Sequence, residues 1–256
     1  MKIFFLVLAR DEKHIEEKIR ELKSLGVPHL IVCGTNLNHP NLVYREPRGK
    51  YDAINYGFTF IPKDIDVVVL NDVVTRIKNF QAALRIIGSD EVALVFAKVC
   101  VEEGPQRLFY AILDFIRRRL LINASGELML IRYNVLKDVL PIKPCKAEDS
   151  CILFKVLEFK RKAVFCEECH LETERTKTAE NEQIYKRKTV AGIYQALRYT
   201  RPPYRIRLFY ILLPVISPLL LVSGKKGYSW MKGILLGLLD YLRGDRTGHW
   251  QTTYLE

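Results

Sequence analysis

Short apolar runs alternate with amphipathic segments over the first third of the chain, and this alternation restricts the fold more than any other feature. Residues 2–8 and 66–70 are continuous apolar runs of strand length, whereas residues 13–24 and 80–87 carry apolar side chains at helical spacing. Strands that are apolar on both faces are typical of parallel sheets, because helices cover both sides of such sheets. The pattern predicts an α/β fold with a mostly parallel sheet flanked by helices.

The remaining segments continue this alternation and direct attention to one edge of the sheet. In an open parallel sheet, ligands bind at the carboxyl ends of the strands. Residues 9–10, 33–34 and 71–72 follow three predicted strands and are expected at that edge. Further strands are predicted over residues 29–33, 42–44, 91–101, 126–132 and 163–172, and further helices over residues 51–60, 106–121, 148–159 and 184–199.

Positive charge gathers beside the most apolar part of the chain. The sequence contains 40 Lys and Arg against 29 Asp and Glu, which gives a net charge of +11. A basic segment next to an apolar one is typical of a membrane surface, and no nucleic-acid-binding motif is present. The basic segment contains Arg198, Arg201, Arg205 and Arg207, and it leads into the apolar residues 208–222.

The apolar C-terminal region is predicted to be a helical hairpin. Two prolines interrupt its first arm, a turn is expected over residues 224–227, and residues 228–242 form the second arm. The 15 residues of that arm span roughly 22 Å, which is less than a bilayer core of about 30 Å. We therefore expect residues 201–256 to lie in one leaflet beside a folded domain of residues 1–200. A soluble hairpin packed on that domain, a dimer contact and a tilted two-span hairpin are the alternatives.

The cysteines and the first residues bear on the compartment. Six cysteines are scattered along the chain, so it is not a small disulfide scaffold. The apolar residues 3–8 lack a small-residue cleavage site and are read as a first strand rather than a signal peptide. Both features favour the reducing cytoplasm. Residues 166–170 have C-x-x-C-H spacing, but no second Cys/His pair completes a zinc site, and on a regular strand Cys169 would face away from Cys166 and His170.

Acidic and basic residues stand at three places that suit catalysis. Asp72 follows the strand of residues 66–70, where it could hold a divalent cation or simply cap a turn. Glu148 and Asp149 begin a predicted helix, where one could act as a general base or both could complement the helix N-terminus. Lys50 and its neighbours stand at the mouth of another helix, which suits a phosphate or nucleotide.

Taken together and in order, these segments resemble glycosyltransferase family 2, the inverting enzymes with the GT-A fold. The resemblance covers roughly residues 1–200, and its motifs lie at plausible spacing on a matching α/β alternation. Residues 7–15 (VLARDEKHI) resemble the family's first strand and its P-x-x-N-E-x-x-x-I loop, residues 49–57 (GKYDAINYG) its G-K-x-x-A-L-N-x-G motif, and residues 69–74 (VLNDVV) the L-N-x-D-V variant of its DXD motif. Residues 125–132 resemble the segment lining the sugar and acceptor site, residues 147–149 the ED motif, and residues 186–195 the R-W-x-x-G-x-x-Q region of members that act at membranes.

The resemblance implies transfer of a sugar, with inversion, from a UDP- or GDP-linked donor to a lipid-phosphate, glycan or other membrane-presented acceptor, at the cytoplasmic face of the cell membrane. Asp149 would be the base, Glu148 would hold hydroxyls, and Asp72 would bind Mg²⁺ or Mn²⁺ on the donor diphosphate. The implied nucleotide-sugar site comprises Ala9, Arg10, Glu12, Lys50, Asn55 and Asp72, and the implied sugar and acceptor site Ser125, Gly126, Arg187 and Lys188.

Three departures from the family's pattern leave alternatives open. Residues 33–34 replace the usual acidic residue, which leaves the nucleotide base open, and Asp72 is the one carboxylate kept from the DXD motif. Lys188 and Thr189 replace the Arg and Trp of a QxxRW motif, which speaks against a processive polysaccharide synthase. The alternatives are a degenerate, non-catalytic membrane-associated binding protein and a sugar nucleotidyltransferase, although no glycine-rich loop follows the first strand. The oligomeric state is left open.

Overall fold

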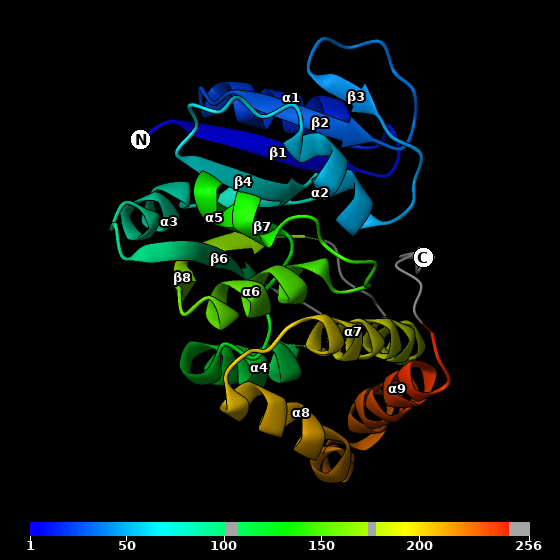
Figure 1. Ribbon diagram of the computed structural model, residues 1–256. Coiled ribbons are helices and arrows are strands. Elements are labelled where there is room, and N and C mark those ends of the chain that lie inside the picture. The colour runs from blue at the N-terminus through cyan, green and yellow to red at the C-terminus, as the bar shows by residue number, and fades with distance from the viewer. Residues whose placement is uncertain (101–106, 174–177, 246–256) are drawn as a thin grey trace.

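An eight-stranded sheet forms the centre of the computed structural model, which describes residues 1–100, 107–173 and 178–245 (Figure 1). The strand order is β3-β2-β1-β4-β7-β6-β8-β5. The strands are β1 (Ile3–Ala9), β2 (His29–Cys33), β3 (Leu42–Tyr44), β4 (Val67–Asp72), β5 (Arg76–Lys78), β6 (Val92–Cys100), β7 (Leu128–Arg132) and β8 (Lys162–Glu172).

The sheet is mostly parallel, as the sequence predicts. β3, β2, β1 and β4 pair in parallel, and so do β6 and β8. β7 runs antiparallel between β4 and β6, which leaves these two strands pointing the same way, and β5 runs antiparallel to β8. The carboxyl ends of β1, β2, β4, β6 and β8 therefore share one edge of the sheet, where ligands are expected to bind.

Helices cover both faces of the sheet, and this explains why the strands are apolar without alternation. In β1, Phe4 and Leu6 belong to one hydrophobic cluster, whereas Phe5 and Val7 belong to the other. The first cluster includes side chains of α2, α5 and α6, and the second includes those of α1 and α3. The helices before the C-terminal region are α1 (Ile15–Ser24), α2 (Lys50–Phe58), α3 (Phe80–Ile87), α4 (Arg107–Leu120), α5 (Tyr133–Val139), α6 (Glu148–Glu158) and α7 (Ala179–Tyr199).

The C-x-x-C-H segment does not follow the regular alternation expected of a strand. The pairing of β8 with β6 passes from Ala97↔Cys166 directly to Lys98↔His170, so β8 carries a bulge. As a result, Cys166 and Cys169 are both buried in the same core cluster, and the prediction that Cys169 faces away is wrong.

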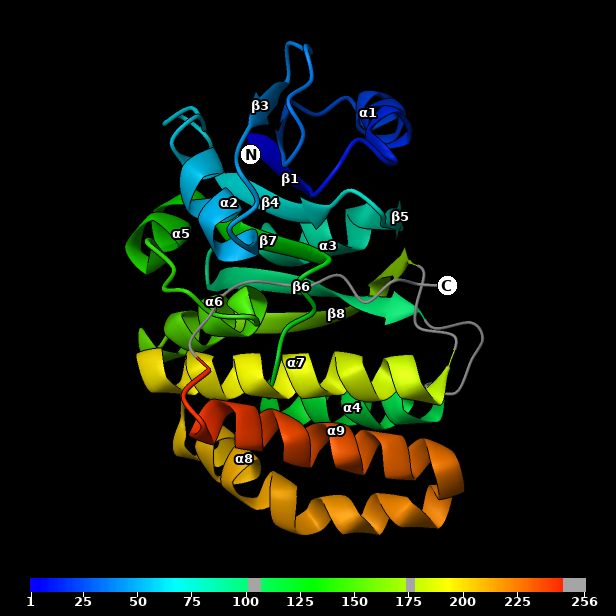
Figure 2. The same cartoon turned by 90° about the vertical axis from the view of Figure 1, so that its right-hand side faces the viewer.

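The predicted apolar hairpin is present at the C-terminus. Its first arm is α8 (Tyr204–Ile216) followed by a 3₁₀ helix, η1 (Ser217–Ser223), and its second arm is α9 (Gly224–Leu242), which runs alongside α7 (Figure 2). Gly224 has φ of 62°, a conformation that favours glycine. Because α9 begins at Gly224 itself, the turn between the two arms is shorter than the predicted turn of residues 224–227.

The hairpin exposes a large apolar surface. Within the described ranges, the stretch Tyr204–Leu242 is the one that is long and apolar enough to cross a membrane by length and composition, with a mean hydropathy of 2.0 in its most apolar window. The reversal at Gly224 makes this stretch two arms rather than one straight span. Large apolar side chains exposed on the hairpin include Ile211, Val215, Leu219, Val222 and Leu242.

Candidate active site

Asp72 and Lys50 form an ion pair at the carboxyl end of β4. Asp72 is the last residue of β4 and Lys50 the first residue of α2, and the ammonium of Lys50 donates to Oδ2 of Asp72. Burial alone would lower the pKa of Lys50, but the carboxylates of Asp72, Glu148 and Glu127 together raise this pKa above its ordinary value. Lys50 is thus a firmly charged cation that links the end of β4 to the start of α6.

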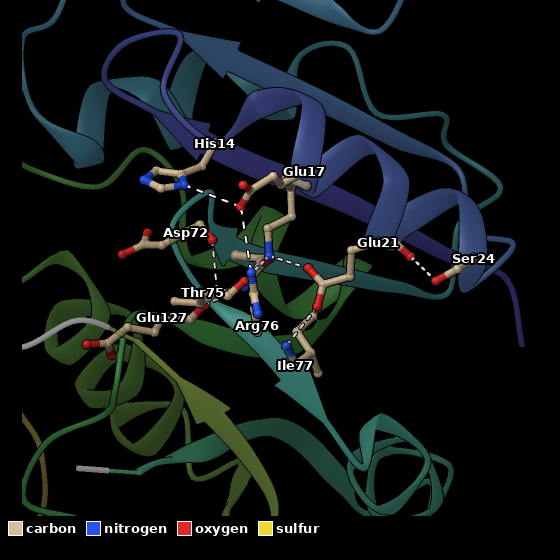
Figure 3. Close-up of polar contacts among 11 residues, drawn as sticks. His14, Glu17, Glu21, Ser24, Asp72, Thr75, Arg76, Ile77 and Glu127 are labelled. Carbon is tan, nitrogen blue, oxygen red and sulfur yellow. Dashed lines mark hydrogen bonds and ion pairs between the residues drawn. The ribbon is translucent and has the colours of Figure 1, made fainter. Parts of the chain in front are cut away.

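Buried hydrogen bonds fix the backbone around Asp72. The amide of Asn71, which is fully buried, donates to Thr75 Oγ1 at 2.8 Å and to the carbonyl of Glu127 at 2.6 Å. The hydroxyl of Thr75 in turn donates to the carbonyl of Asp72 at 2.8 Å. The carboxylates of Asp72 and Glu127 point toward the same side of this network in Figure 3.

A buried lysine on α1 supports the same loop. Lys18 is 2% exposed and donates both to the carbonyl of Thr75 and to Glu21, 2.6 Å away. The other carboxylate oxygen of Glu21 accepts the backbone N–H of Ile77 at 2.8 Å. Burial lowers the pKa of Lys18, whereas Glu21 opposes this change. α1 therefore holds the segment that follows Asp72.

Glu148 and Asp149 open α6, and both carboxyl groups have raised pKa values. Burial, aided by the charge of Asp149, raises the pKa of Glu148 to about 8 despite the nearby Lys50. Burial, aided by Glu127, raises the pKa of Asp149 to about 6, although the backbone N–H of Ser150 donates to its carboxylate at 2.6 Å. Burial thus raises the pKa of both neighbouring carboxyl groups toward neutrality, a setting that suits acid–base chemistry.

Lys50, Glu148 and Asp149 line a cavity of about 600 Å³, a volume that includes open solvent at the mouth of the cavity. Its walls come from α4, α6, α7 and the segment before β7. Gly126 lies so close to α6 that an added Cβ would be 3.0 Å from Cβ of Asp149 and 3.2 Å from its Oδ2. Glycine at this position therefore leaves room for the Asp149 carboxylate beside the cavity.

The structure brings several predicted site residues together. Lys50, Ser125, Gly126, Glu148 and Asp149 all line the cavity, and Asp72 adjoins it through its ion pair with Lys50. The hydroxyl of Ser125 is buried and donates to the carbonyl of Ala97, so its role there is to hold the wall.

The predicted nucleotide residues lie in different settings. Ala9 ends β1, one residue past the Leu8 that pairs with Asp72, and Arg10 and Glu12 follow it as exposed residues at the same edge. Asn55 donates to the carbonyl of Ile142 at 3.0 Å and accepts its N–H at 2.8 Å. The amide of Asn55 therefore fastens the loop before α6 onto α2.

The two predicted basic residues of α7 are outside the cavity lining. Arg187 faces α9, where it makes two hydrogen bonds to Asp240 at 2.5 and 2.7 Å. Lys188 is half-buried, and burial together with the charges of Lys146 and Arg10 lowers its pKa. Lys188 thus shares a positively charged neighbourhood with Arg10, on the side of the implied nucleotide pocket.

Several residues of the cavity wall were not among the predicted site residues. On α4, Arg117 is buried and bonded to Asp114 at 3.0 Å and to Asn123 at 3.1 Å. On α7, Tyr185, Lys186 and Thr189 line the cavity, and Thr189 follows Lys186 by three residues and Tyr185 by four, the spacing of one helical face. The sequence contains this spacing, but the spacing identifies cavity residues only once the side of α7 that faces the cavity is known. Glu127 also lines the cavity, within the segment 125–132 that the resemblance assigns to the sugar and acceptor site.

Comparison with known proteins supports the fold. No protein-family model matches the chain, and no curated protein matches it by sequence. Among solved structures, it is similar to a mannosyltransferase from Pyrobaculum calidifontis in complex with GDP-Man and Mn²⁺, with 15% identity, coverage of 94% of this chain and 87% of that chain, and a TM-score of 0.71. It is also similar to GalNAc-T7 with UDP, GalNAc and Mn²⁺ (11% identity, 95% of this chain and 57% of that chain, TM-score 0.56). A third similar structure is the M. tuberculosis glucosyl-3-phosphoglycerate synthase (14% identity, 76% of this chain and 80% of that chain, TM-score 0.51).

These likenesses show that the chain has the fold of GT-A glycosyltransferases, as the sequence resemblance implies. The mixed α/β sheet and the flanking helices agree with that fold. At 11–15% identity the comparison concerns architecture, and the chemistry of the site rests on the residues described above.

Proposed function

We propose that the chain is an inverting glycosyltransferase that moves a sugar from a UDP- or GDP-linked donor to a lipid-linked or other membrane-presented acceptor. The observation that carries this proposal is the placement of Glu148 and Asp149 at the start of α6 beside the Lys50–Asp72 ion pair, on the wall of one cavity. The fold adds support, because GT-A structures of similar architecture were solved with GDP-Man or UDP and Mn²⁺.

The geometry supports a single displacement. Asp149 would take the proton of an acceptor hydroxyl as its oxygen attacks the anomeric carbon of the donor sugar. The bond from that carbon to the diphosphate breaks on the opposite side, so the configuration inverts and the nucleoside diphosphate leaves with the electron pair. Glu148 would hold sugar or acceptor hydroxyls by hydrogen bonds, and Lys50 would face the developing negative charge.

The residues at the end of β4 fit a divalent cation only together with the donor's phosphate oxygens. Within residues 1–100, 107–173 and 178–245, no group of three or more His, Cys, Asp and Glu side chains could hold a metal by itself. Asp72 and Glu127 point to the same side and offer oxygen ligands of the kind that Mg²⁺ and Mn²⁺ prefer. When bound there, the ion would neutralise charge on the departing diphosphate.

Nucleotide binding gives the direct test of this proposal. We expect UDP or GDP with Mn²⁺ to raise the melting temperature more than either component alone, because a ligand that binds only the folded state stabilises it, by about 2.7 kcal/mol at a concentration of 100 times Kd. Differential scanning fluorimetry of the full chain measures the shift, with ADP as a base control. If no nucleoside diphosphate stabilises the protein with or without Mn²⁺, the proposed function fails and the non-catalytic alternative gains.

We further propose that residues 1–200 form the catalytic domain and that residues 201–256 associate with the cytoplasmic face of the cell membrane. The described part of the hairpin exposes apolar side chains and carries Arg205, Arg207, Lys225 and Lys226. Cations at the rim of an apolar surface suit anionic headgroups, and the hairpin arms can lie in one leaflet.

Vesicle binding tests the membrane assignment. Val222 is 91% exposed on the hairpin, and burying such a side chain contributes about 1.5 kcal/mol or more, so Val222→Glu should weaken binding at least about tenfold. Sedimentation with phosphatidylglycerol-rich vesicles measures the loss, and added salt should weaken binding of the unmodified protein. Leu25→Glu, at an exposed apolar position after α1, is the matched control. Equal binding by all three proteins would contradict the assignment.

A further inference from the structure

The hairpin contributes a buried tryptophan to the part of the molecule that contains the cavity. Trp230 of α9 is 6% exposed and stacks on Phe109 of α4, with ring centroids 4.6 Å apart and planes 29° apart. Its ring also meets Tyr110 edge-on at 6.3 Å. Since Tyr110 lines the cavity, Trp230 lies directly behind one wall of the site.

The same tryptophan holds a buried lysine of that wall. Lys186 of α7 is 6% exposed and lines the cavity, and its ammonium lies 3.7 Å from the ring centroid of Trp230 and 4.9 Å from that of Tyr110. Glu182, one helical turn earlier and 1% exposed, places a carboxylate oxygen 3.7 Å from the ammonium. Aromatic faces and the Glu182 carboxylate therefore help to orient this cation, and cation–π contacts are strongest where water is excluded.

Glycines of α9 make this arrangement depend on the hairpin. A Cβ built on Gly233 would lie 2.8 Å from Cβ of Lys186, and one built on Gly237 would lie 2.5 Å from the carbonyl of Arg187. α9 thus lies directly against the backbone of α7 at the turn that carries Lys186. A displacement of α9 would move both Trp230 and Lys186.

We infer that Lys186 binds a phosphate group of the acceptor and that Trp230 is a positioning residue for it, so that the C-terminal hairpin completes the acceptor side of the site. A buried ammonium at a cavity wall is a strong partner for phosphate oxygens, because charge-assisted hydrogen bonds gain strength out of water. Asp149 lines the same cavity, so an acceptor could present its hydroxyl to Asp149 and its phosphate to Lys186. The identification of this phosphate compound as the acceptor rests on the proposed function.

The tryptophan itself can report on the occupancy of Lys186. The sequence has two tryptophans, Trp230 and Trp250, and Trp250 lies outside the described residues. In the full chain with Trp250→Phe, fluorescence comes from Trp230, whose ring is 3.7 Å from the ammonium of Lys186. We expect octyl phosphate to change this emission saturably and octanol, which has the same alkyl chain without the phosphate, to leave it unchanged.

Two variants assign the effect to the lysine. Lys186→Met alone would leave Glu182 buried beside an apolar side chain, so we pair it with Glu182→Gln to preserve folding. The double variant should bind octyl phosphate at least about tenfold more weakly, whereas Lys186→Arg, which keeps the charge, should retain binding. The same emission change with octanol, or unchanged affinity in a folded double variant, would overturn the inference.

Calorimetry with octyl phosphate tests the role of Trp230. Trp230→Leu should weaken binding several-fold, and Trp230→Phe, which keeps an aromatic face toward Lys186, should restore most of it. Equal affinities in both variants and the unmodified protein would show that Trp230 does not position Lys186. Because these measurements need no sugar donor, phosphate binding at Lys186 and the proposed transfer reaction can fail independently.

Discussion

Asp149→Asn should lower the rate of sugar transfer at least about 100-fold at neutral pH, since a positioned general base contributes roughly 10²–10⁴-fold. Asparagine has the same shape as aspartate, so the close contact with Gly126 and the N–H of Ser150 are retained while the proton acceptor is lost. The measurement is turnover of UDP- and GDP-sugars in the presence of Mn²⁺ and vesicles carrying lipid-linked acceptors. Affinity for the nucleoside diphosphate should change little.

Two observations separate loss of the base from general damage. Asp138→Asn, on the exposed side of α5, is the matched control and should keep full activity. In the unmodified protein the base must be ionised, so the rate should rise as pH increases through about 6, the raised pKa of Asp149. Because Glu148 and Asp149 interact, this apparent pKa belongs to the pair. Full turnover by the asparagine variant, or a rate independent of pH from 5 to 7, would remove Asp149 from the role of base.

Asp72→Ala should abolish the stabilisation that Mn²⁺ adds to nucleoside diphosphate binding and should lower turnover on the order of 100-fold, the typical effect of losing one group that stabilises transition-state charge. Asp72 supplies the carboxylate at the end of β4, and Lys50 would keep Glu148 and Glu127 as acidic neighbours in the variant. The fold should therefore survive. Thermal shift with and without Mn²⁺ measures the metal effect, and donor turnover measures the chemistry.

The other end of the same strand provides the control for this variant. Asp66 directly precedes β4, has a side chain that is 52% exposed and accepts the backbone N–H of Lys2 at 2.6 Å. Asp66→Ala removes a carboxylate from the same segment without touching the cavity, and it should leave the Mn²⁺ effect intact. If Asp72→Ala behaves like Asp66→Ala in both assays, the metal is not held at β4.

The α/β fold could be predicted from the sequence because its signal is local. Apolar runs in β1 and β4 show that both faces are buried, and helical spacing shows α1 and α3. The direction of β7 could not be predicted, because a strand buried on both faces carries the same pattern whether it runs parallel or antiparallel to its neighbours. β5, a three-residue strand of Arg76–Lys78 at the sheet edge, has no apolar pattern to reveal it.

Candidate site residues could be predicted from the sequence where they lie at the ends of strands or helices. Asp72 at a strand end and Glu148–Asp149 at a helix start can be found from sequence, since those positions expose backbone and side chains at the ligand edge. The contacts of Asn55 and Arg187 could not be found, because their partners lie 87 and 53 residues away. Lys186 was missed beside Arg187 and Lys188 because each helical residue turns by about 100°, and only the contact with α9 fixes which one meets the cavity.

The packing of α9 on α7 also bears on how such an enzyme would meet its substrate. An enzyme tethered to a membrane by a flexible linker samples many orientations, and its reach depends on linker length. Here α7 is a 21-residue helix that lines the cavity and also packs against the glycines of α9, so the hairpin is joined directly to the wall of the site. On the proposed function, the angle between the cavity and the bilayer is fixed when the chain folds, and acceptor molecules diffusing in the plane of the membrane meet a site that is already oriented.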